Sequence, residues 1–141
     1  DNHENIHAGL PSICRRTDQP AAALVTDLKQ RGLLDSTVVH WGGEIGRLPV
    51  VQSRNKPGRD HNGQGFTTWL AGGGFKPGTL YGETDEVGHH AAVNKVTAND
   101  YQATLLHQFG LDHEQLTFHH GGQSQKLTNG RPARVVKEIV G

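Results

Sequence analysis

The order of the periodic segments constrains the fold of this chain most strongly. Two segments with helical spacing, residues 18–31 and 97–110, enclose two short β-prone runs, residues 36–41 and 65–71. Between the two runs, residues 43–64 carry charges, glycines and prolines without any period. This succession of helix, strand, loop, strand and helix is typical of an α/β domain. It predicts a mainly parallel sheet flanked by helices.

Local signals mark the ends of the expected helices. The first helix carries one apolar stripe at i, i+3, i+4 and i+7 and is expected to end at Gly32. The second begins at a capping-box pattern, Thr97 with Asp100, and is expected to end at Gly110.

The two ends of the chain have weaker patterns. Residues 1–16 are predicted as a loop, because Gly9 and Pro11 oppose regular structure. Towards the other end, Asn129-Gly130 is a candidate hairpin turn and Val135-Val136 a candidate edge strand.

Composition excludes several classes of function. The 14 basic and 14 acidic residues balance, so the chain has no general field to attract nucleic acid. No apolar run approaches the roughly 20 residues that a membrane-spanning helix needs, so membrane insertion is not expected. The length of 141 residues suits one domain. The single cysteine, Cys14, excludes an intrachain disulfide and a Cys-rich zinc site.

The loop of residues 43–64 is the first candidate for a functional site, since ligands in parallel α/β sheets bind at the carboxyl ends of strands. Asp60 and His61 are adjacent residue types that bind divalent cations, and Glu44 adds a carboxylate. Arg47 and Arg59 offer the planar guanidinium groups that bind phosphate-like anions. The alternative to a binding site is that residues 43–64 form a solvated charged loop that binds no ligand.

A second group of ligand types lies at the start of the chain. His3, Glu4 and His7 match the H-E-x-x-H pattern of zinc peptidases, in which two His residues one helical turn apart bind zinc and the Glu is the general base. That chemistry needs a helix, which Gly9 and Pro11 oppose here. We therefore expect a chance match and keep peptidase chemistry as an alternative.

A resemblance to a known superfamily unites these segments. The segments concerned are residues 1–3, 17–24, 38–47, 58–61, 67–78, 100–106 and 109–111. In order and spacing, they are similar to the C-terminal half of sulfatases and their alkaline phosphatase relatives, and more closely to a bacterial sulfatase-like family of unassigned function.

The resemblance implies a fold and a set of ligands. The fold would be the C-terminal portion of an alkaline phosphatase-like sandwich, with residues 1–141 forming a single, incomplete sulfatase-like domain. Asp1 and His3 resemble the first ligand pair of that superfamily, His61 resembles its late metal-binding His, and Glu44 stands where a carboxylate-His pair is usual. The metal would be zinc, calcium, magnesium or manganese.

The expected function is hydrolysis of a small phosphate or sulfate ester with a divalent metal. The resemblance places the nucleophile in the N-terminal half of such domains, and Cys14 lacks the sequence context of a modified sulfatase Cys, so the chain alone is expected to be inactive. A non-catalytic metal- or anion-binding module is the first alternative, and the zinc peptidase is the second. The resemblance also implies a periplasmic or secreted protein.

Overall fold

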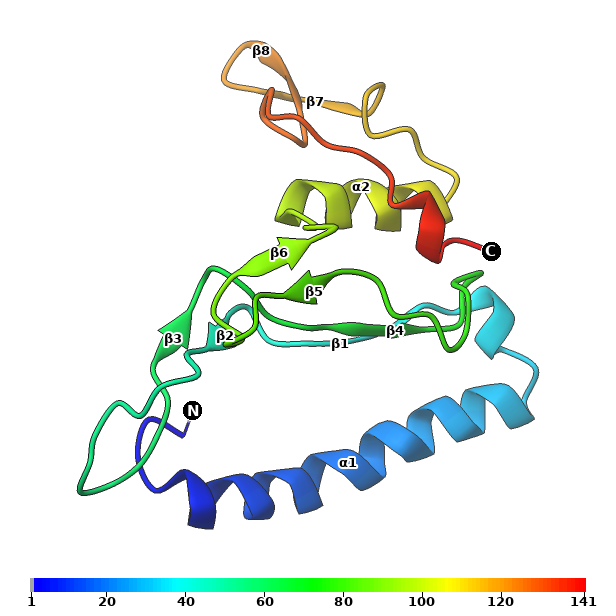
Figure 1. The fold of residues 1–141 in the computed structure, drawn as a ribbon. Coiled ribbons are helices and arrows are strands. Elements are labelled where there is room, and N and C mark those ends of the chain that lie inside the picture. The colour runs from blue at the N-terminus through cyan, green and yellow to red at the C-terminus, as the bar shows by residue number, and fades with distance from the viewer. Residues whose placement is uncertain (1) are drawn as a thin grey trace. The chain divides into compact units, whose positions relative to one another are not determined.

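The computed structural model describes residues 2–141, which form two compact units. The first comprises the residues up to Gly73 together with Gly82–Asn94, and the second comprises Gly74–Tyr81 and Lys95–Gly141. In chain order, the elements of the first unit are the following (Figure 1): α1 (Ile6–Gln30), η1 (Leu34–Ser36), β1 (Val39–Trp41), β2 (Gly46–Arg47), β3 (His61–Asn62), β4 (Trp69–Ala71), β5 (Glu83–Thr84) and β6 (Ala91–Val93).

The first helix is much longer than its apolar stripe predicts. α1 begins at Ile6, directly after Asn5, whose left-handed backbone (φ 52°) ends the preceding segment. Residues 6–16 are therefore helical, and the prediction of a loop there was wrong. Pro11 removes only one backbone donor, and a helix already nucleated by its neighbours can continue through that loss. The predicted end is confirmed, since Gly32 has a positive φ of 69° just after the helix.

The predicted strands form, but they pair in the opposite direction to that expected. β1 and β4 lie within residues 36–41 and 65–71, and they run antiparallel with Trp41 opposite Trp69 and Val39 opposite Ala71. A parallel pair needs a crossover connection, usually helical, whereas residues 42–68 contain no helix. The chain instead returns through a loop, which suits antiparallel pairing.

All ladders among residues 2–141 are two-stranded and antiparallel: β1–β4, β2–β3 and β5–β6 in the first unit, and the pair of β7 (Thr117–His120) with β8 (Gln123–Lys126) in the second. The predicted parallel sheet flanked by helices, as part of an alkaline phosphatase-like sandwich, is therefore wrong. The alternation of helices and strands does not indicate crossover units in this chain, because no helix lies between the two β-prone runs.

The second unit is built around α2 (Ala98–Gln108) and contains β7 (Thr117–His120), β8 (Gln123–Lys126) and η2 (Lys137–Ile139). The predicted capping box is confirmed, because Asp100 N–H donates to the Thr97 hydroxyl and Thr97 N–H donates to the Asp100 carboxylate. The other Asp100 oxygen accepts from Arg134 N–H at 2.8 Å. The Thr104 hydroxyl accepts from Val136 N–H at 2.9 Å, so residues 134–136 are held along the helix.

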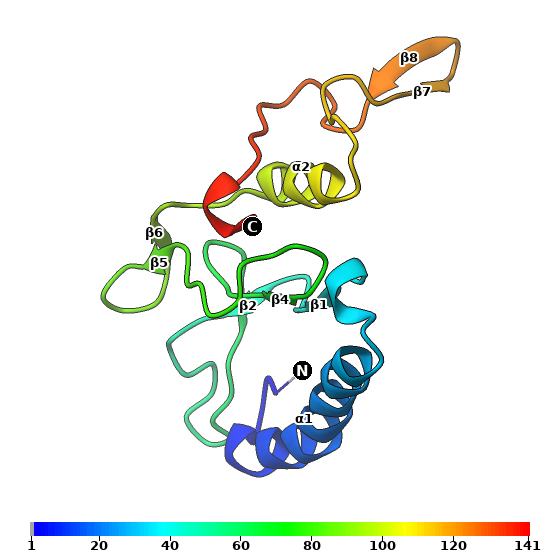
Figure 2. The ribbon, with the colours of Figure 1, turned by 90° about the vertical axis from the view of Figure 1, so that its right-hand side faces the viewer.

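The C-terminal segment differs from its prediction. The hairpin is β7–β8, joined through Gly121-Gly122, and it extends away from α2 in Figures 1 and 2. Asn129-Gly130 forms a turn with positive φ values but joins no strand pair. Val135-Val136 is not a strand, and Val136 is instead fully buried.

Few hydrophobic side chains are buried. Among residues 2–141, the only hydrophobic residues that are buried are Phe75, Ala103 and Val136. All three lie in the second unit. In the described part of the chain, no helix is both long and apolar enough to cross a membrane.

Candidate functional site

The long loop after β1 folds back on itself as an irregular hairpin. Its base is the β2–β3 ladder, in which Arg47 faces His61. The pairing continues beyond the strands, since Leu48 N–H donates to the Asp60 carbonyl at 2.9 Å. Near the tip, Gln52 N–H donates to the Gly58 carbonyl at 3.0 Å. This backbone pairing brings side chains from both arms to one side of the hairpin base.

The N-terminal segment lies against this hairpin. Arg59 N–H donates to the Asn2 carbonyl at 3.0 Å, and Ile6 N–H donates to the Pro57 carbonyl at 2.8 Å. Gly58 makes this close approach possible, because a Cβ atom there would overlap the backbone carbonyl of His3. The loop and the start of the chain, which the sequence predicted as separate clusters, therefore form one site.

Two imidazole rings meet where these segments join. The Nε2 atoms of His3 and His61 lie 3.1 Å apart, and the ring centroids are separated by 4.8 Å. Two His ligands of a tetrahedral zinc ion, each with a Zn–N distance of about 2.0–2.1 Å, would place their nitrogens roughly 3.4 Å apart. The His3–His61 pair thus fits two positions of such a site. One ring nitrogen donating to the other would produce the same distance.

Two further side chains orient His3. Its Nδ1 atom lies 2.8 Å from Gln52 Oε1 and 3.7 Å from Asp60 Oδ1. Because the amide oxygen can only accept, Nδ1 carries the proton in this contact, and Nε2 is an acceptor that lies beside both His61 Nε2 and Arg47 Nη1. A metal-binding His is usually held in this way by a hydrogen bond at its other nitrogen. Asp60 Oδ1 also accepts from the His61 N–H at 2.7 Å.

The two arginines have different surroundings. Arg47 is half-buried, and its Nη1 atom lies 3.2 Å from His3 Nε2 and 3.2 Å from the Arg59 carbonyl oxygen. Arg59 donates from Nη1 to the Pro49 carbonyl at 2.6 Å, which ties its guanidinium to the loop backbone. Arg47 is therefore the arginine that lies beside the His3–His61 pair.

The structure brings together four of the residues that the sequence singled out, namely His3, Arg47, Asp60 and His61. Glu44 is exposed, and Asp1 lies outside the described residues. Gln52 was missed, because an amide in a polar loop carries no motif. Among residues 2–141, no group of three or more His, Cys, Asp or Glu side chains is arranged to hold a metal ion.

The H-E-x-x-H segment does not form a helical pair of ligands. His3 precedes α1 and His7 lies within it, with the left-handed Asn5 between them. Glu4 pairs with Lys56 at 3.3 Å on the solvent-exposed surface. The two histidines therefore do not share one helical face.

A second His-containing cluster lies in the loop between β5 and β6. Asp85 accepts from the N–H groups of His89 and His90, and its Oδ2 lies 3.1 Å from His90 Nδ1. The hydrogen bond from the His89 N–H is the largest cause of the lowered pKa of Asp85. The buried Asn62 donates to the His89 carbonyl at 2.8 Å, so this loop supports the strand that carries His61.

Comparison with known proteins identifies a family. No curated protein and no solved structure shows significant similarity to the chain. The sequence profile of a family described as "Protein of unknown function (DUF1501)" matches residues 1–140. This family differs from the sulfatase and alkaline phosphatase superfamily, so the family assignment that the resemblance predicted is wrong. The chain belongs to the DUF1501 family, which is described as being of unknown function.

Proposed function

We propose that this chain contributes the His3–His61 pair to a divalent-metal site that binds a phosphate or sulfate ester for hydrolysis. The observation that carries the proposal is the 3.1 Å separation of the two Nε2 atoms, which come from segments 58 residues apart in the sequence. Two ring nitrogens at this distance match the spacing of adjacent ligands around one ion. Water and the substrate are candidates for the remaining positions.

The surroundings of the pair support an anionic substrate. Arg47 places a permanent positive charge at 3.2 Å from His3 Nε2. A guanidinium beside a bound cation would hold the non-bridging oxygens of a phosphate or sulfate group. A bound metal would neutralise the ester and lower the pKa of an attacking water molecule. The residues of the chain would position the ester and keep His3 in its ligand tautomer through Gln52.

A non-catalytic metal- and anion-binding module is the second candidate. It is favoured by the types of the residues that converge within the described chain, namely His, Arg, Gln and Asp, because none of these side chains is a hydroxyl or thiol nucleophile.

The first test measures metal binding by titration calorimetry with Zn²⁺, Mn²⁺ and Ca²⁺ separately. We expect His3→Ala and His61→Ala each to weaken binding of the preferred ion by at least about tenfold, which corresponds to about 1.4 kcal/mol. His7→Ala is the matched control, since His7 lies on the exposed surface of α1, and it should bind as the original chain does. An unchanged metal stoichiometry in His61→Ala would overturn the proposal.

The second arm of this experiment separates the two candidates. Arg47→Ala should retain the metal and lose about tenfold in affinity for inorganic phosphate or sulfate, because a hydrogen bond to a charged group contributes about 1.5–3 kcal/mol. Hydrolysis of p-nitrophenyl phosphate or p-nitrophenyl sulfate by the metal-loaded chain would support the hydrolase. Binding of both metal and anion without hydrolysis by the full-length protein would support the non-catalytic module.

A further inference from the structure

The chain contains two Asn-Gly pairs, Asn62-Gly63 and Asn129-Gly130. In such a pair, the backbone nitrogen after the Asn can attack the carbon of the side-chain amide, because the chain holds the two atoms near each other and a five-membered ring results. Glycine leaves this nitrogen most accessible, since it has no Cβ atom and lets the backbone rotate into the reactive conformation. Both pairs carry the same reactive groups, so the fold determines which of them reacts.

Solvent exposure alone does not distinguish a reactive Asn in this chain. The accessible area of the chain is 10050 Å², whereas a folded monomer of 15.3 kDa exposes roughly 7,100 Å². The other asparagines are followed by residues whose side chains hinder the attacking nitrogen, and they are Asn2, Asn5, Asn55, Asn94 and Asn99. The hydrogen bonds around the two Asn-Gly pairs therefore decide between them.

Asn62 lies in β3, and both ends of its side-chain amide are hydrogen-bonded. Its Nδ2 atom donates to the His89 carbonyl at 2.8 Å, and its Oδ1 atom accepts from the Gln64 N–H at 2.9 Å. The residue is only 1% exposed. Attack by the Gly63 nitrogen would require the amide to turn and break both hydrogen bonds, so it must wait for a local opening of the strand. The folded chain therefore protects Asn62.

Asn129 lies at the centre of an open turn in the second unit. Asn129 and Gly130 have positive φ values of 51° and 71°, and the Arg131 N–H donates to the Thr128 carbonyl at 3.0 Å, which is the pattern of a type I′ turn. Both central residues are exposed to solvent. Among residues 2–141, no group accepts a hydrogen bond from the Gly130 N–H, and none bonds to the Asn129 amide. The attacking nitrogen and the amide that it attacks are therefore both accessible.

We propose that Asn129 is a site of spontaneous deamidation in the folded chain, whereas Asn62 is protected from it. The Gly130 nitrogen forms a bond to Asn129 Cγ and gives its proton to a base from the solvent. The bond from Cγ to Nδ2 breaks, and Nδ2 leaves as ammonia. Water then opens the resulting succinimide ring at one of its two carbonyl carbons. The product at position 129 is an aspartate or an isoaspartate, each with a carboxylate in place of the amide.

The modification changes both the charge and the backbone of this turn. The new carboxylate follows Lys126 and precedes Arg131 in the sequence, so it adds a negative charge between two basic residues. An isoaspartate routes the main chain through the former side chain and lengthens it between Thr128 and Gly130. Thr128 is only 8% exposed, so the change in the turn acts directly beside a buried residue of the second unit.

The test compares the two Asn-Gly pairs within the same chain. The folded chain is incubated in a mildly alkaline buffer made with heavy-oxygen water, because the water molecule that opens the succinimide leaves its oxygen in the product. Digestion with trypsin in ordinary water, which cleaves after Arg59 and Lys126, places the two pairs on separate peptides, and fragment mass spectra locate the label. We expect position 129 to be labelled at least about tenfold faster than position 62, which corresponds to about 1.4 kcal/mol of local opening at Asn62.

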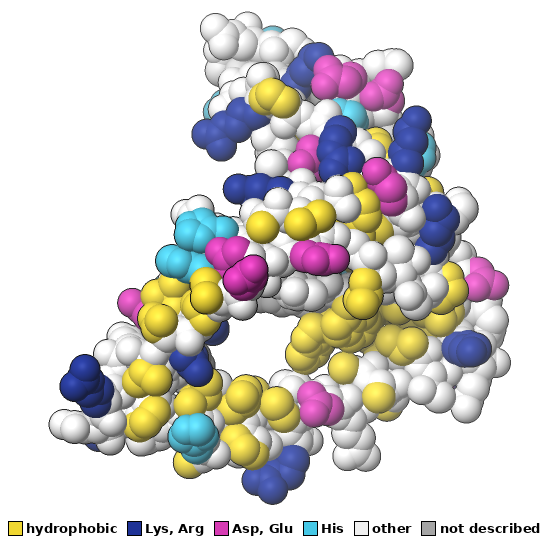
Figure 3. All heavy atoms as spheres, viewed as in Figure 1, with side chains coloured by type: hydrophobic (Ala, Val, Ile, Leu, Met, Phe, Trp, Pro, Cys, Tyr) yellow, Lys and Arg dark blue, Asp and Glu magenta, His cyan; other side chains and the backbone are white. Residues whose placement is uncertain are grey.

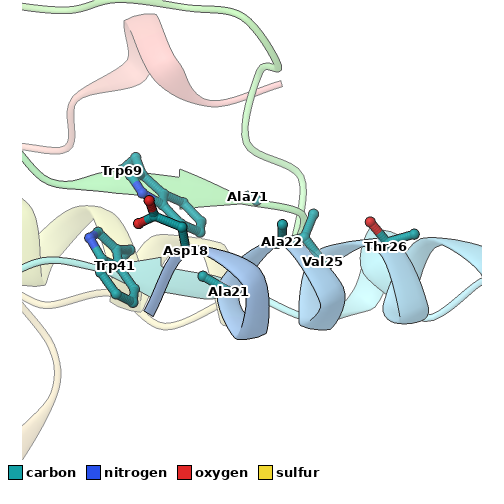
Figure 4. A pocket seen from close by; sticks show the side chains of 8 residues that line it. All are labelled: Asp18, Ala21, Ala22, Val25, Thr26, Trp41, Trp69 and Ala71. Atoms are coloured by element: carbon teal, nitrogen blue, oxygen red, sulfur yellow. The ribbon is translucent and has the colours of Figure 1, made fainter. Parts of the chain in front are cut away.

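The same labelling in urea provides the control for the role of the fold. Both positions should then be labelled at similar rates, because unfolding removes the hydrogen bonds of Asn62. Trp41 and Trp69 report the state of the first unit, since their rings stack at an interplanar angle of 10° and line a groove of about 530 Å³ beside α1 (Figure 4). Figure 3 shows hydrophobic side chains bordering the space between the helix and the strands. Tryptophan emission should shift to longer wavelength in urea and stay unshifted in the labelling buffer.

Gly130→Ala and Gly110→Ala form a matched pair of variants. The two glycines have positive φ values of 71° and 74° and open space around the missing Cβ atom, so Ala adds similar backbone strain at both positions. Gly130→Ala should slow labelling at position 129 by about tenfold or more, because its methyl group hinders the attacking nitrogen. Gly110→Ala should leave the labelling of position 129 unchanged.

Three outcomes would overturn the proposal. The first is a folded chain that acquires no heavy oxygen at position 129. The second is equal labelling of positions 62 and 129 in the folded chain, which would show that the hydrogen bonds of Asn62 do not protect it. The third is a difference between the two positions that persists in urea, which would assign the difference to the neighbouring sequence rather than to the fold.

Discussion

Gly58 controls the candidate site although it has no side chain. A Cβ atom at this position would overlap the His3 carbonyl, so Gly58→Ala should displace the N-terminal segment from the hairpin and separate His3 from His61. We expect metal affinity to fall as far as in His3→Ala, with about 1–3 kcal/mol lost from the free energy of unfolding. Metal titration and urea unfolding would measure both effects.

Gly63→Ala is the control for this prediction. A Cβ at Gly63 would meet only Ile45 Cδ1 at 3.9 Å, an ordinary contact, and Gly63 has no positive φ. Its stability and metal binding should therefore stay close to those of the original chain. Normal metal affinity in Gly58→Ala would show that the close approach of the two segments is not required.

At the scale of single residues, the sequence predicted which residues belong to the candidate site better than it predicted which of them contact one another. Asp60 and His61 stood out because they are adjacent ligand types in a glycine-rich loop, and His3 stood out in a motif of another kind. The meeting of His3 with His61 depends on backbone pairing through Pro57 and Arg59, which no periodicity encodes. Gln52 could not be singled out, because only its contact with His3 gives it a role.

Among the elements, α2 provides the clearest test of a titrating group. Burial raises the pKa of Asp100, but hydrogen bonds from Thr97 and Arg134 outweigh it and hold the pKa below its ordinary value of 3.8. A lowered pKa means that the carboxylate stabilises the fold above the ordinary value, and that this contribution is lost as pH falls through the folded-state value.

Asp100→Asn should therefore destabilise the chain most near neutral pH. An amide has one acceptor oxygen, so either Thr97 N–H or Arg134 N–H would lose its partner, at a cost of about 1–3 kcal/mol. The difference in unfolding free energy between the original chain and the variant should shrink as pH falls below 3.8. Urea unfolding over a pH series would measure it, and a constant difference would contradict this account.

The helices and strands also show which features of secondary structure could be predicted from sequence patterns. The capping box of α2 was predicted correctly because every signal lies within four residues of the helix start. Strand positions were found as well, but their direction was not, since pairing depends on the course of residues 42–68. The start of α1 was missed because Gly9 and Pro11 are local signals that the rest of the helix overrides.

For the molecule as a whole, the exposed surface predicts a small heat capacity change on unfolding. A fully packed chain of 141 residues would give about 1.7–2.1 kcal/mol/K. Apolar surface that is already exposed in the folded chain adds nothing to this change. Calorimetry should therefore give a value clearly below about 1.7 kcal/mol/K, while a value within the usual range would show that the chain in solution is more fully packed.

The 58 residues between the two imidazoles also determine when the site can form during folding. The β7–β8 hairpin and both helices close short segments of chain, whereas the His3–His61 pair requires a long loop to close first. The entropic cost of closing a loop grows with its length, and non-local contacts slow folding. The two ring nitrogens would therefore meet late, after the local elements have formed, and a metal ion would bind mainly to chains that are already folded.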